Sequence, residues 1–303
     1  MLQVKYDDTF KKEYYKKIAN RKMEKFNNRS FESYYNSYIK SKLSNYSLED
    51  IICGDFEKLV EIKRIIGLKY NSKTNILKQF FNYDKISKKF KSKTSAFQKT
   101  ISKLFEENVD LHTCYYCNID FINTFKNNNE IKNAFTLDHI LEKAQYPFLA
   151  LSLYNLLPTC YTCNSKVKDS KIEFEKTSPT SKNFDFNLKV KFKSFIVNKD
   201  FQIKENDDFN IKLVESYSNK YDKYIKSLNL NNRYDYHKYK VLEIIEKRRE
   251  YPDSRIKELS LITKKTEEEI KQDLFGIYTN ENFNRRPLSK LIKDISEELG
   301  LTK

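Results

Sequence analysis

The sequence predicts a mainly α-helical protein of the α+β class. Apolar residues recur at intervals of three and four over much of the chain, as at Leu59, Ile62 and Ile66. The 303 residues include only four Gly and five Pro, so tight turns are few and helices are favoured. The stretch 183–215 instead alternates apolar and polar residues, which is typical of antiparallel strands.

Residues 1–108 are predicted to form a basic helical domain. Ser47 with Asp50 three residues later predicts a helix start, and lysines interleaved with apolar residues over 85–105 predict a basic helix lying on a core. Residues 1–100 hold 23 Lys and Arg against 11 Asp and Glu, whereas the rest of the chain holds 34 against 31. This local surplus indicates a surface that faces a polyanion such as nucleic acid. A helical face whose lysines are simply solvated is the alternative.

Residues 109–178 differ in character and are predicted to form a separate core. Short β-like runs and loops replace the helical periodicity, and two CxxC pairs fall here. The run 134–140, AFTLDHI, predicts a strand. The polar run 127–130, NNNE, predicts a loop or the tip of a hairpin.

Residues 179–303 are predicted to form a third region in which antiparallel strands precede helices. Two to four strands are expected within 183–215, and 236–251 predicts a long amphipathic helix. Further along the chain, Thr266 and Glu269 have the spacing of a capping box. The last helix is predicted to start near Pro287 and to end at Gly300.

The sequence has no feature that indicates secretion or membrane insertion. Apolar runs are too short to cross a bilayer, and the first residues lack the apolar middle of a signal peptide. We therefore expect a soluble, cytoplasmic protein with no membrane partner. In such a reducing compartment, five cysteines do not indicate a disulfide framework.

Four of the five cysteines form two matched pairs. They are Cys114, Cys117, Cys160 and Cys163. Two intervening residues let both thiolates of a pair turn toward one ion, and two pairs make the tetrahedral four-thiolate site that zinc prefers. A redox CxxC needs a βα context and only one pair, and an iron–sulfur site usually has other spacings. The sequence therefore predicts structural Zn2+, and Cys53 is predicted to be an ordinary buried or half-buried thiol.

The segment between and just after these pairs carries a further pattern. Its elements, in chain order, are Asp138, His139, Asn155, Asn164 and Lys168. This order resembles the motif of the HNH endonucleases over about residues 112–172. The resemblance implies a central ββα-metal core with the four-cysteine zinc site, in an HNN variant because Asn164 stands where many members have His. The flanking regions are similar to those of uncharacterised HNH proteins of bacterial defence or mobile-element loci.

The resemblance implies a role for each motif residue. His139 is, by position, the general base that deprotonates a water molecule. Asp138 and Asn164 are the ligands of a catalytic Mg2+ or Mn2+, a hard cation that takes carboxylate and amide oxygens. Asn155 is the middle Asn of the catalytic motif, which orients the base or pins the loop.

Structural alternatives stay open for several of these residues. Asp138 could cap a turn, and Asn155 could do no more than satisfy backbone groups of its loop. Asn164 could be the N-cap of the helix that follows the second CxxC. Lys166 and Lys168 come about one turn later and are candidates for contact with phosphate.

These features together predict a metal-dependent HNH endonuclease that hydrolyses phosphodiester bonds of DNA with low sequence preference. The resemblance further implies an effector of a bacterial anti-phage system with a regulatory protein partner such as an ATPase. One alternative is an RNA-cleaving enzyme on the same fold. Another is a non-catalytic, zinc-stabilised module that binds nucleic acid or protein.

Overall fold

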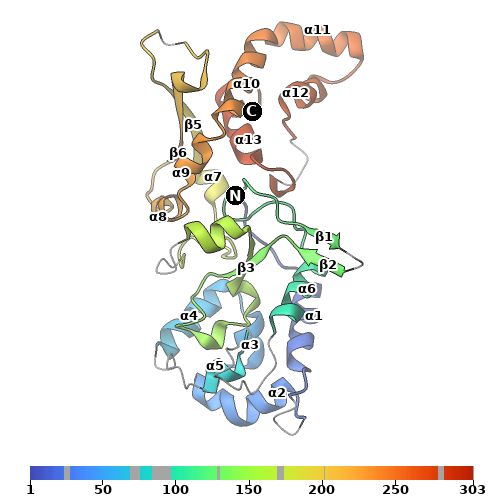
Figure 1. The fold of residues 1–303 in the computed structure, drawn as a ribbon, viewed down its shortest axis with the longest axis vertical. Helices are drawn as coiled ribbons and strands as arrows, with labels where there is room; N and C mark the ends of the chain where they lie inside the picture. Colours follow the sequence, from blue (N-terminus) through green and yellow to red (C-terminus); the bar gives the residue numbers. More distant parts are fainter. Residues whose placement is uncertain are drawn as a thin grey trace. The chain divides into compact units, whose positions relative to one another are not determined.

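The computed structural model describes residues 1–23, 28–68, 76–83, 97–127, 130–168, 174–200, 202–278 and 283–302 (Figure 1). The chain divides into two compact units. The N-terminal unit comprises Gln3–Leu111 and Ile122–Phe184, and the C-terminal unit comprises Met1–Leu2, His112–Phe121 and Asp185–Lys303. The three-part division expected from the sequence, at 108 and 178, stays a prediction.

The N-terminal unit begins with helices. They are α1 (Asp8–Ala19), α2 (Phe31–Tyr34) with its extensions η2 (Tyr35–Ile39) and η3 (Lys40–Leu43), α3 (Leu48–Cys53), α4 (Phe56–Ile66), α5 (Ile76–Phe80) and α6 (Gln98–Asn108). The helix start predicted at Ser47 is confirmed, since Ser47 and Asp50 form a capping box at the start of α3. The end of the predicted basic helix forms α6, whereas its lysine-rich part, 84–96, lies outside the described residues.

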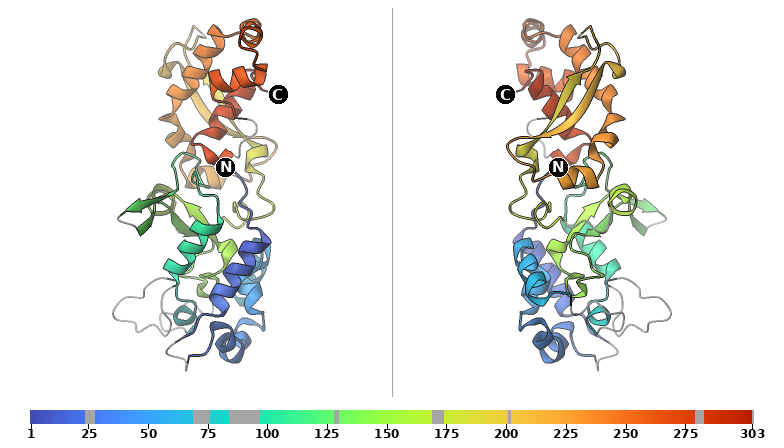
Figure 2. Two further views of the ribbon diagram at one scale, coloured as in Figure 1. Left: turned by 90° about the vertical axis from the view of Figure 1, so that its right-hand side faces the viewer. Right: turned by 90° about the vertical axis from the view of Figure 1, so that its left-hand side faces the viewer.

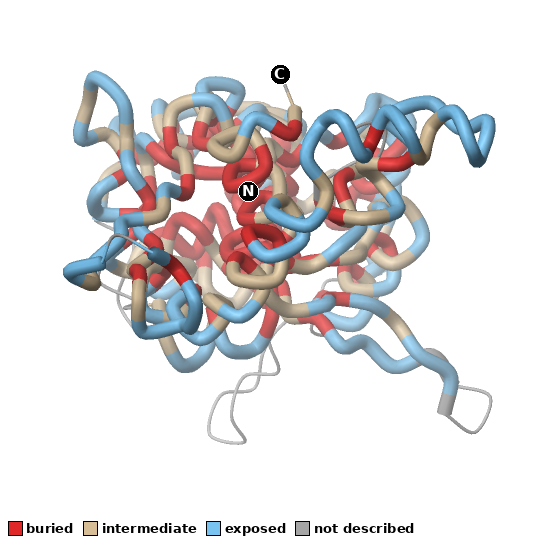
Figure 3. The backbone as a smooth tube through the Cα atoms, turned by 90° about the horizontal axis from the view of Figure 1, so that it is seen from above, coloured by how far each residue is buried: buried red, intermediate tan, exposed pale blue. Residues whose placement is uncertain are grey.

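Aromatic side chains fill the core of these helices. Tyr6, Phe10, Tyr14 and Phe105 meet edge to face, with ring centroids 5.5 to 6.4 Å apart. This geometry brings the positive edge of one ring against the negative face of the next. In Figure 3, buried positions alternate with exposed ones along the backbone, as expected for helices with one face in a core.

Two short antiparallel strand pairs follow the helices. In the first pair, β1 (Thr124–Asn127) runs beside β2 (Glu130–Asn133), and the predicted tip at 128–129 lies outside the described residues. In the second pair, β3 (Thr136–His139) runs beside β4 (Leu156–Thr159), with Thr136 opposite Thr159 and His139 opposite Leu156. The strand predicted over 134–140 is thereby confirmed. A π-helical turn, η6 (Thr162–Val167), follows β4.

The C-terminal unit is built on one antiparallel pair covered by helices. Its elements are α7 (Phe186–Lys189), β5 (Val190–Ile196), β6 (Phe209–Glu215), α8 (Asp222–Ser227), α9 (Leu230–Asp235), α10 (Lys238–Glu250), α11 (Asp253–Thr263), α12 (Glu267–Phe275) and α13 (Ser289–Glu298). Figure 2 shows β5 and β6 as a twisted pair, with α13 against β5 and α9 against β6. The capping box of α12 at Thr266 and Glu269 is confirmed.

The expected strand over the first residues of 183–215 is wrong. These residues form the helical turn α7, because the backbone N–H groups of Leu188 and Lys189 both donate to the Asp185 carbonyl. The turn buries the Phe186 ring against Tyr221 and leaves Leu188 exposed. Burial of one aromatic ring therefore outweighs the period-two pattern at this point.

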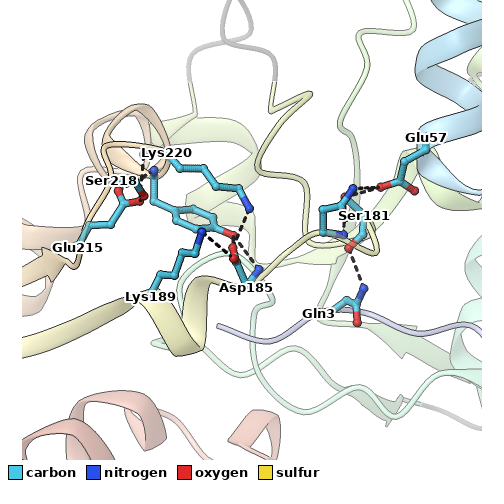
Figure 4. Close-up of polar contacts among 10 residues, drawn as sticks. Gln3, Glu57, Ser181, Asp185, Lys189, Glu215, Ser218 and Lys220 are labelled. Atoms are coloured by element: carbon cyan, nitrogen blue, oxygen red, sulfur yellow. Dashed lines mark hydrogen bonds and ion pairs between the residues drawn. The ribbon is translucent and has the colours of Figure 1, made fainter.

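Each unit has a partly buried polar cluster. In the C-terminal unit, the Asp185 carboxylate accepts hydrogen bonds from Tyr221 at 2.6 Å and Lys220 at 2.7 Å (Figure 4). Partial burial opposes the charge, but the bonds from Lys220, Tyr221 and Lys189 outweigh it and hold the pKa of Asp185 well below its usual range. In the N-terminal unit, Ser181 donates to Glu57 at 2.6 Å, also in Figure 4.

The predicted fold class is confirmed, since the protein is mainly helical with short antiparallel strand pairs. No helix in the described ranges is long and apolar enough to span a bilayer.

Candidate active site and metal centre

The four predicted zinc ligands come together in one buried cluster. The Sγ atoms of Cys114, Cys117, Cys160 and Cys163 all lie within 4.8 Å of one another. A tetrahedron with Zn–S bonds of about 2.3 Å has sulfur–sulfur edges of roughly 3.8 Å. Four buried thiols at this spacing, without a carboxylate or imidazole among them, fit a structural zinc ion and are consistent with the prediction.

Each CxxC turn also has the backbone arrangement that stabilises thiolates. The N–H of Ile119 donates to Cys117 Sγ, and the N–H of Cys163 donates to Cys160 Sγ, both at 3.4 Å. Asn118 has a left-handed φ of 54°, which lets the first turn close, and its N–H donates to the Cys114 carbonyl at 2.8 Å. N–H groups that point at sulfur favour the deprotonated form, which is the form that binds metal.

Cys53 stands apart from this cluster, as predicted. It is half-buried, its Sγ lies 3.6 Å from the Lys11 carbonyl, and burial raises the pKa of its thiol to about 12. A thiol with so high a pKa is protonated and inert at neutral pH.

His139 lies at the end of β3, with its imidazole held by a backbone carbonyl. Nε2 lies 3.0 Å from the carbonyl oxygen of Ala150. A carbonyl oxygen can only accept, so Nε2 carries the proton and Nδ1 keeps its lone pair. The ring is therefore fixed in the tautomer that offers Nδ1 as a base.

The surroundings of His139 keep its imidazole neutral. Burial, together with the positive charges of Lys143 and Lys168, lowers the pKa of His139 to about 3, although the bond to Ala150 opposes the shift. The ring of Tyr83 packs edge-on at 4.6 Å between centroids, and Lys143 lies 4.9 Å over that same ring. Tyr83 comes three residues after the end of α5. A residue of the helical region therefore forms one wall around the imidazole.

Asn155 is fully buried, and its amide is used entirely by the loop 140–155. Oδ1 accepts from the Leu141 N–H at 2.6 Å, while Nδ2 donates to the carbonyls of Leu141 at 3.0 Å and Leu149 at 2.9 Å. Leu149 adjoins Ala150, whose carbonyl holds His139. The contacts of Asn155 therefore pin the loop, and they reach the imidazole only through the backbone.

Residues of the N-terminal helices fasten the same loop from the other side. Tyr14 of α1 donates to the Leu151 carbonyl at 2.9 Å, and Ser152 donates to the Ile51 carbonyl of α3. Tyr6 donates to the Leu156 carbonyl at 2.8 Å. These helices thus serve as the platform for the segment between β3 and β4.

Asp138 is buried and already paired with a cation. Its Oδ2 accepts from Lys168 Nζ, which also donates to the His139 carbonyl at 3.2 Å. Lys168 was expected to face phosphate, yet its ammonium lies on the carboxylate. Whether it meets phosphate stays a prediction.

Asn164 lies inside η6, the third residue of this turn. The residue at the N-cap position is Tyr161, so the alternative that Asn164 caps the helix is wrong. Its backbone N–H donates to the Cys160 carbonyl at 3.1 Å, whereas no hydrogen bond to its side-chain amide is found across the described part of the chain, and the residue is half-buried. Lys166, on the same turn, is exposed, and its Nζ lies 6.0 Å over the Tyr161 ring.

Asp138 and Asn164 carry the oxygen donors proposed for a hard divalent cation. β3, which carries Asp138, is in contact with η6, which carries Asn164. A carboxylate and an amide oxygen are ligands that suit Mg2+ or Mn2+ better than metals that prefer imidazole or thiolate. The ligand roles of both residues remain a proposal.

Sequence reasoning missed three contributors to this site. The Ala150 carbonyl leaves no side-chain signal, and Tyr83 is far from the motif in the chain. Lys143 follows His139 by four residues in the sequence. Of the three contributors, it is the one that the sequence could have revealed.

Comparison with known proteins identifies the segment that carries these residues. A family model of the HNH endonucleases matches residues 114–170. The match includes all four cysteines and every predicted motif residue from Asp138 to Lys168. No curated protein and no solved structure was found to match the chain.

Proposed function

The chain contains an HNH endonuclease domain over residues 114–170, and from that premise we propose that it is a metal-dependent DNA endonuclease with low sequence preference. HNH nucleases act on nucleic acids, so nuclease activity follows from the family. The proposal of a metal-dependent DNA endonuclease rests on the imidazole of His139. This ring is anchored through Nε2 and is adjacent in sequence to the carboxylate of Asp138.

His139 acts in this proposal as the general base. Its Nδ1 accepts a proton from the water that attacks phosphorus, while the bond from Nε2 to Ala150 holds the ring in place. The low pKa keeps the imidazole unprotonated at neutral pH, but it also makes the base weak. The negative charge of a bound phosphate acts to raise this pKa, whereas the charge of the divalent cation acts to lower it.

Asp138 and Asn164 would hold a catalytic Mg2+ or Mn2+, whose charge neutralises the phosphate and the leaving oxygen. Asn155 is a positioning residue, because its amide fixes the loop whose carbonyl orients the base. The four-cysteine zinc site is structural, since four buried thiolates leave no open position for a substrate.

A nucleic acid is the proposed substrate because the surplus of Lys and Arg in the first third of the chain suits a phosphate backbone without reading sequence. DNA is proposed over RNA on the resemblance to the HNH endonucleases. A role in anti-phage defence, with a regulatory partner such as an ATPase, rests on the sequence resemblance alone. Plaque counts on bacteria that carry the wild-type protein or His139→Ala test that role.

The experiment that tests the proposed function is cleavage of supercoiled plasmid and of a structured RNA by the purified, zinc-loaded protein. We expect nicking of the plasmid at low salt with Mg2+ or Mn2+ and none with a chelator. Cleavage of RNA alone would replace DNA with RNA as the substrate. Binding of both nucleic acids with cleavage of neither would favour the non-catalytic module.

A further inference from the structure

The ammonium of Lys168 is enclosed on several sides. It contacts Asp138 Oδ2, lies 3.2 Å from the His139 carbonyl oxygen and sits 5.6 Å over the ring of Phe174. Only 7% of the Lys168 side chain and 9% of the Asp138 side chain are exposed. The pair is therefore a buried ion pair at the carboxylate that is the proposed metal ligand.

A buried ion pair is held together because removal of either member takes from the other its opposite charge in a desolvated site. A divalent cation bound to Asp138 would stand beside the Lys168 ammonium, and like charges at such a distance repel strongly in a low-dielectric site. The ammonium and the divalent cation are therefore competing partners of one carboxylate.

A second anion would remove this conflict. Lys168 carries its charge on a flexible four-carbon stem, so the ammonium can turn to another acceptor without a change of backbone. The phosphate of a nucleic acid bound next to His139 is such an acceptor, because the Lys168 ammonium lies beside the His139 carbonyl.

We propose that Lys168 is a resident cation that neutralises Asp138 until nucleic acid draws it onto phosphate, so that metal and nucleic acid bind cooperatively. This inference rests on the proposed function and adds a regulation of the same site. By linkage, whatever factor nucleic acid adds to metal affinity, the metal adds to nucleic-acid affinity. The nuclease is thereby restrained while no substrate is bound.

The test is a Mn2+ titration followed by electron paramagnetic resonance, on zinc-loaded protein with and without a DNA duplex. All proteins carry His139→Ala, which prevents cleavage during the measurement and leaves the backbone acceptor of Lys168 in place. Without DNA, Lys168→Gln should bind Mn2+ about ten-fold more tightly than its parent, because the competing charge is gone. DNA should tighten Mn2+ binding to the parent at least about five-fold and should have a much smaller effect on Lys168→Gln.

The matched control is Lys166→Gln, which removes the same charge from the same turn but not from the carboxylate. Its Mn2+ affinity without DNA should equal that of the parent. Equal Mn2+ affinity of the parent and Lys168→Gln would overturn the proposal, as would an unchanged effect of DNA on Lys168→Gln. If Lys168→Gln does not fold, the proposal is tested on the parent protein alone. A Mn2+ affinity of the parent that DNA leaves unchanged would then contradict the proposal.

Asp138→Asn separates this inference from the proposed function. Loss of Mn2+ binding in that variant places the cation at Asp138, and the comparison with Lys168→Gln then decides the role of the lysine. Mn2+ binding that is unaffected by Asp138→Asn would reject the metal site itself and the inference with it.

Discussion

The loop 140–155 and the turn η6 each supply the motif with one asparagine, and the two asparagines are used in opposite ways. Asn155 is fully buried and gives its whole amide to the backbone of Leu141 and Leu149. Asn164 is half-buried on a turn that starts before it. Its side-chain amide has no hydrogen bond in the described part of the chain.

The proposed roles differ accordingly: Asn155 holds a loop, whereas Asn164 is proposed as a metal ligand. A buried amide with three backbone partners holds a loop in a single conformation. An amide on a short turn directly after a zinc ligand has a fixed position and an available oxygen, which are the requirements for a metal ligand. The predictions below test this contrast, in order of their expected effect on stability.

The largest effect is expected from Cys163→Ser, which removes a ligand that precedes Asn164. The variant should lose most of its zinc and its melting temperature should fall by about 10 °C or more, because zinc binding contributes directly to folding. Metal content and thermal unfolding measure both effects. Cys53→Ser is the matched control, and an equal loss in both variants would contradict a structural zinc site.

Asn155→Ala should be the most destabilising change within the loop. It removes a hydrogen bond from three backbone groups, but the Leu149 carbonyl keeps the N–H of Ser152 at 3.3 Å. The cost of about 1–3 kcal/mol for a buried group left unsatisfied therefore applies to the N–H and the carbonyl of Leu141. Cleavage should fall as well, because the Ala150 carbonyl then no longer holds His139 in one place. Chemical denaturation measures the stability. A denaturation midpoint of Asn155→Ala equal to that of wild type would show that the loop does not depend on this amide.

Acidification should weaken the loop region through His139. In the folded chain the pKa of His139 is about 3, against 6.5 for the unperturbed imidazole. Between these values the unfolded chain binds more protons, so this contribution is complete above pH 6.5 and is lost as the pH falls toward 3. In denaturation without added divalent cation, the stability of wild type should fall more steeply with decreasing pH than that of His139→Ala. Parallel curves would contradict a neutral His139 imidazole in the folded chain.

Asn164→Ala should have the smallest effect on stability, within about 0.5 kcal/mol, as for other half-exposed side chains without partners. Its metal-dependent cleavage should nevertheless fall at least about ten-fold, since one oxygen ligand is lost. Asn164→His should keep cleavage and shift the preference toward metals that favour imidazole. Full activity of Asn164→Ala with Mg2+ would remove this residue from the proposed ligands.

The sequence predicts much of the metal centre because its chemistry is local. The spacing within each CxxC pair and the adjacency of Asp138 and His139 follow from short stretches of chain, and the structure brings all four cysteines together. The fold class and two of the capping boxes follow from local patterns too.

The remaining features depend on contacts that no local pattern records. Tyr6 and Tyr14 have the spacing of core residues, yet their hydroxyls bind carbonyls 150 and 137 residues away. The two asparagines of the motif look alike in sequence, and only their partners distinguish them. The pairing of Lys168 with Asp138 depends likewise on the return of β4 beside β3.

The most direct test of the account is the rate of plasmid nicking by wild type and by His139→Ala, in single turnover with matched zinc content and saturating Mg2+. The account predicts a loss of about 10²- to 10⁴-fold, which is the usual contribution of a general base, with nucleic-acid binding retained. Equal rates in the two proteins would contradict the assignment of His139 as the base of an HNH active site.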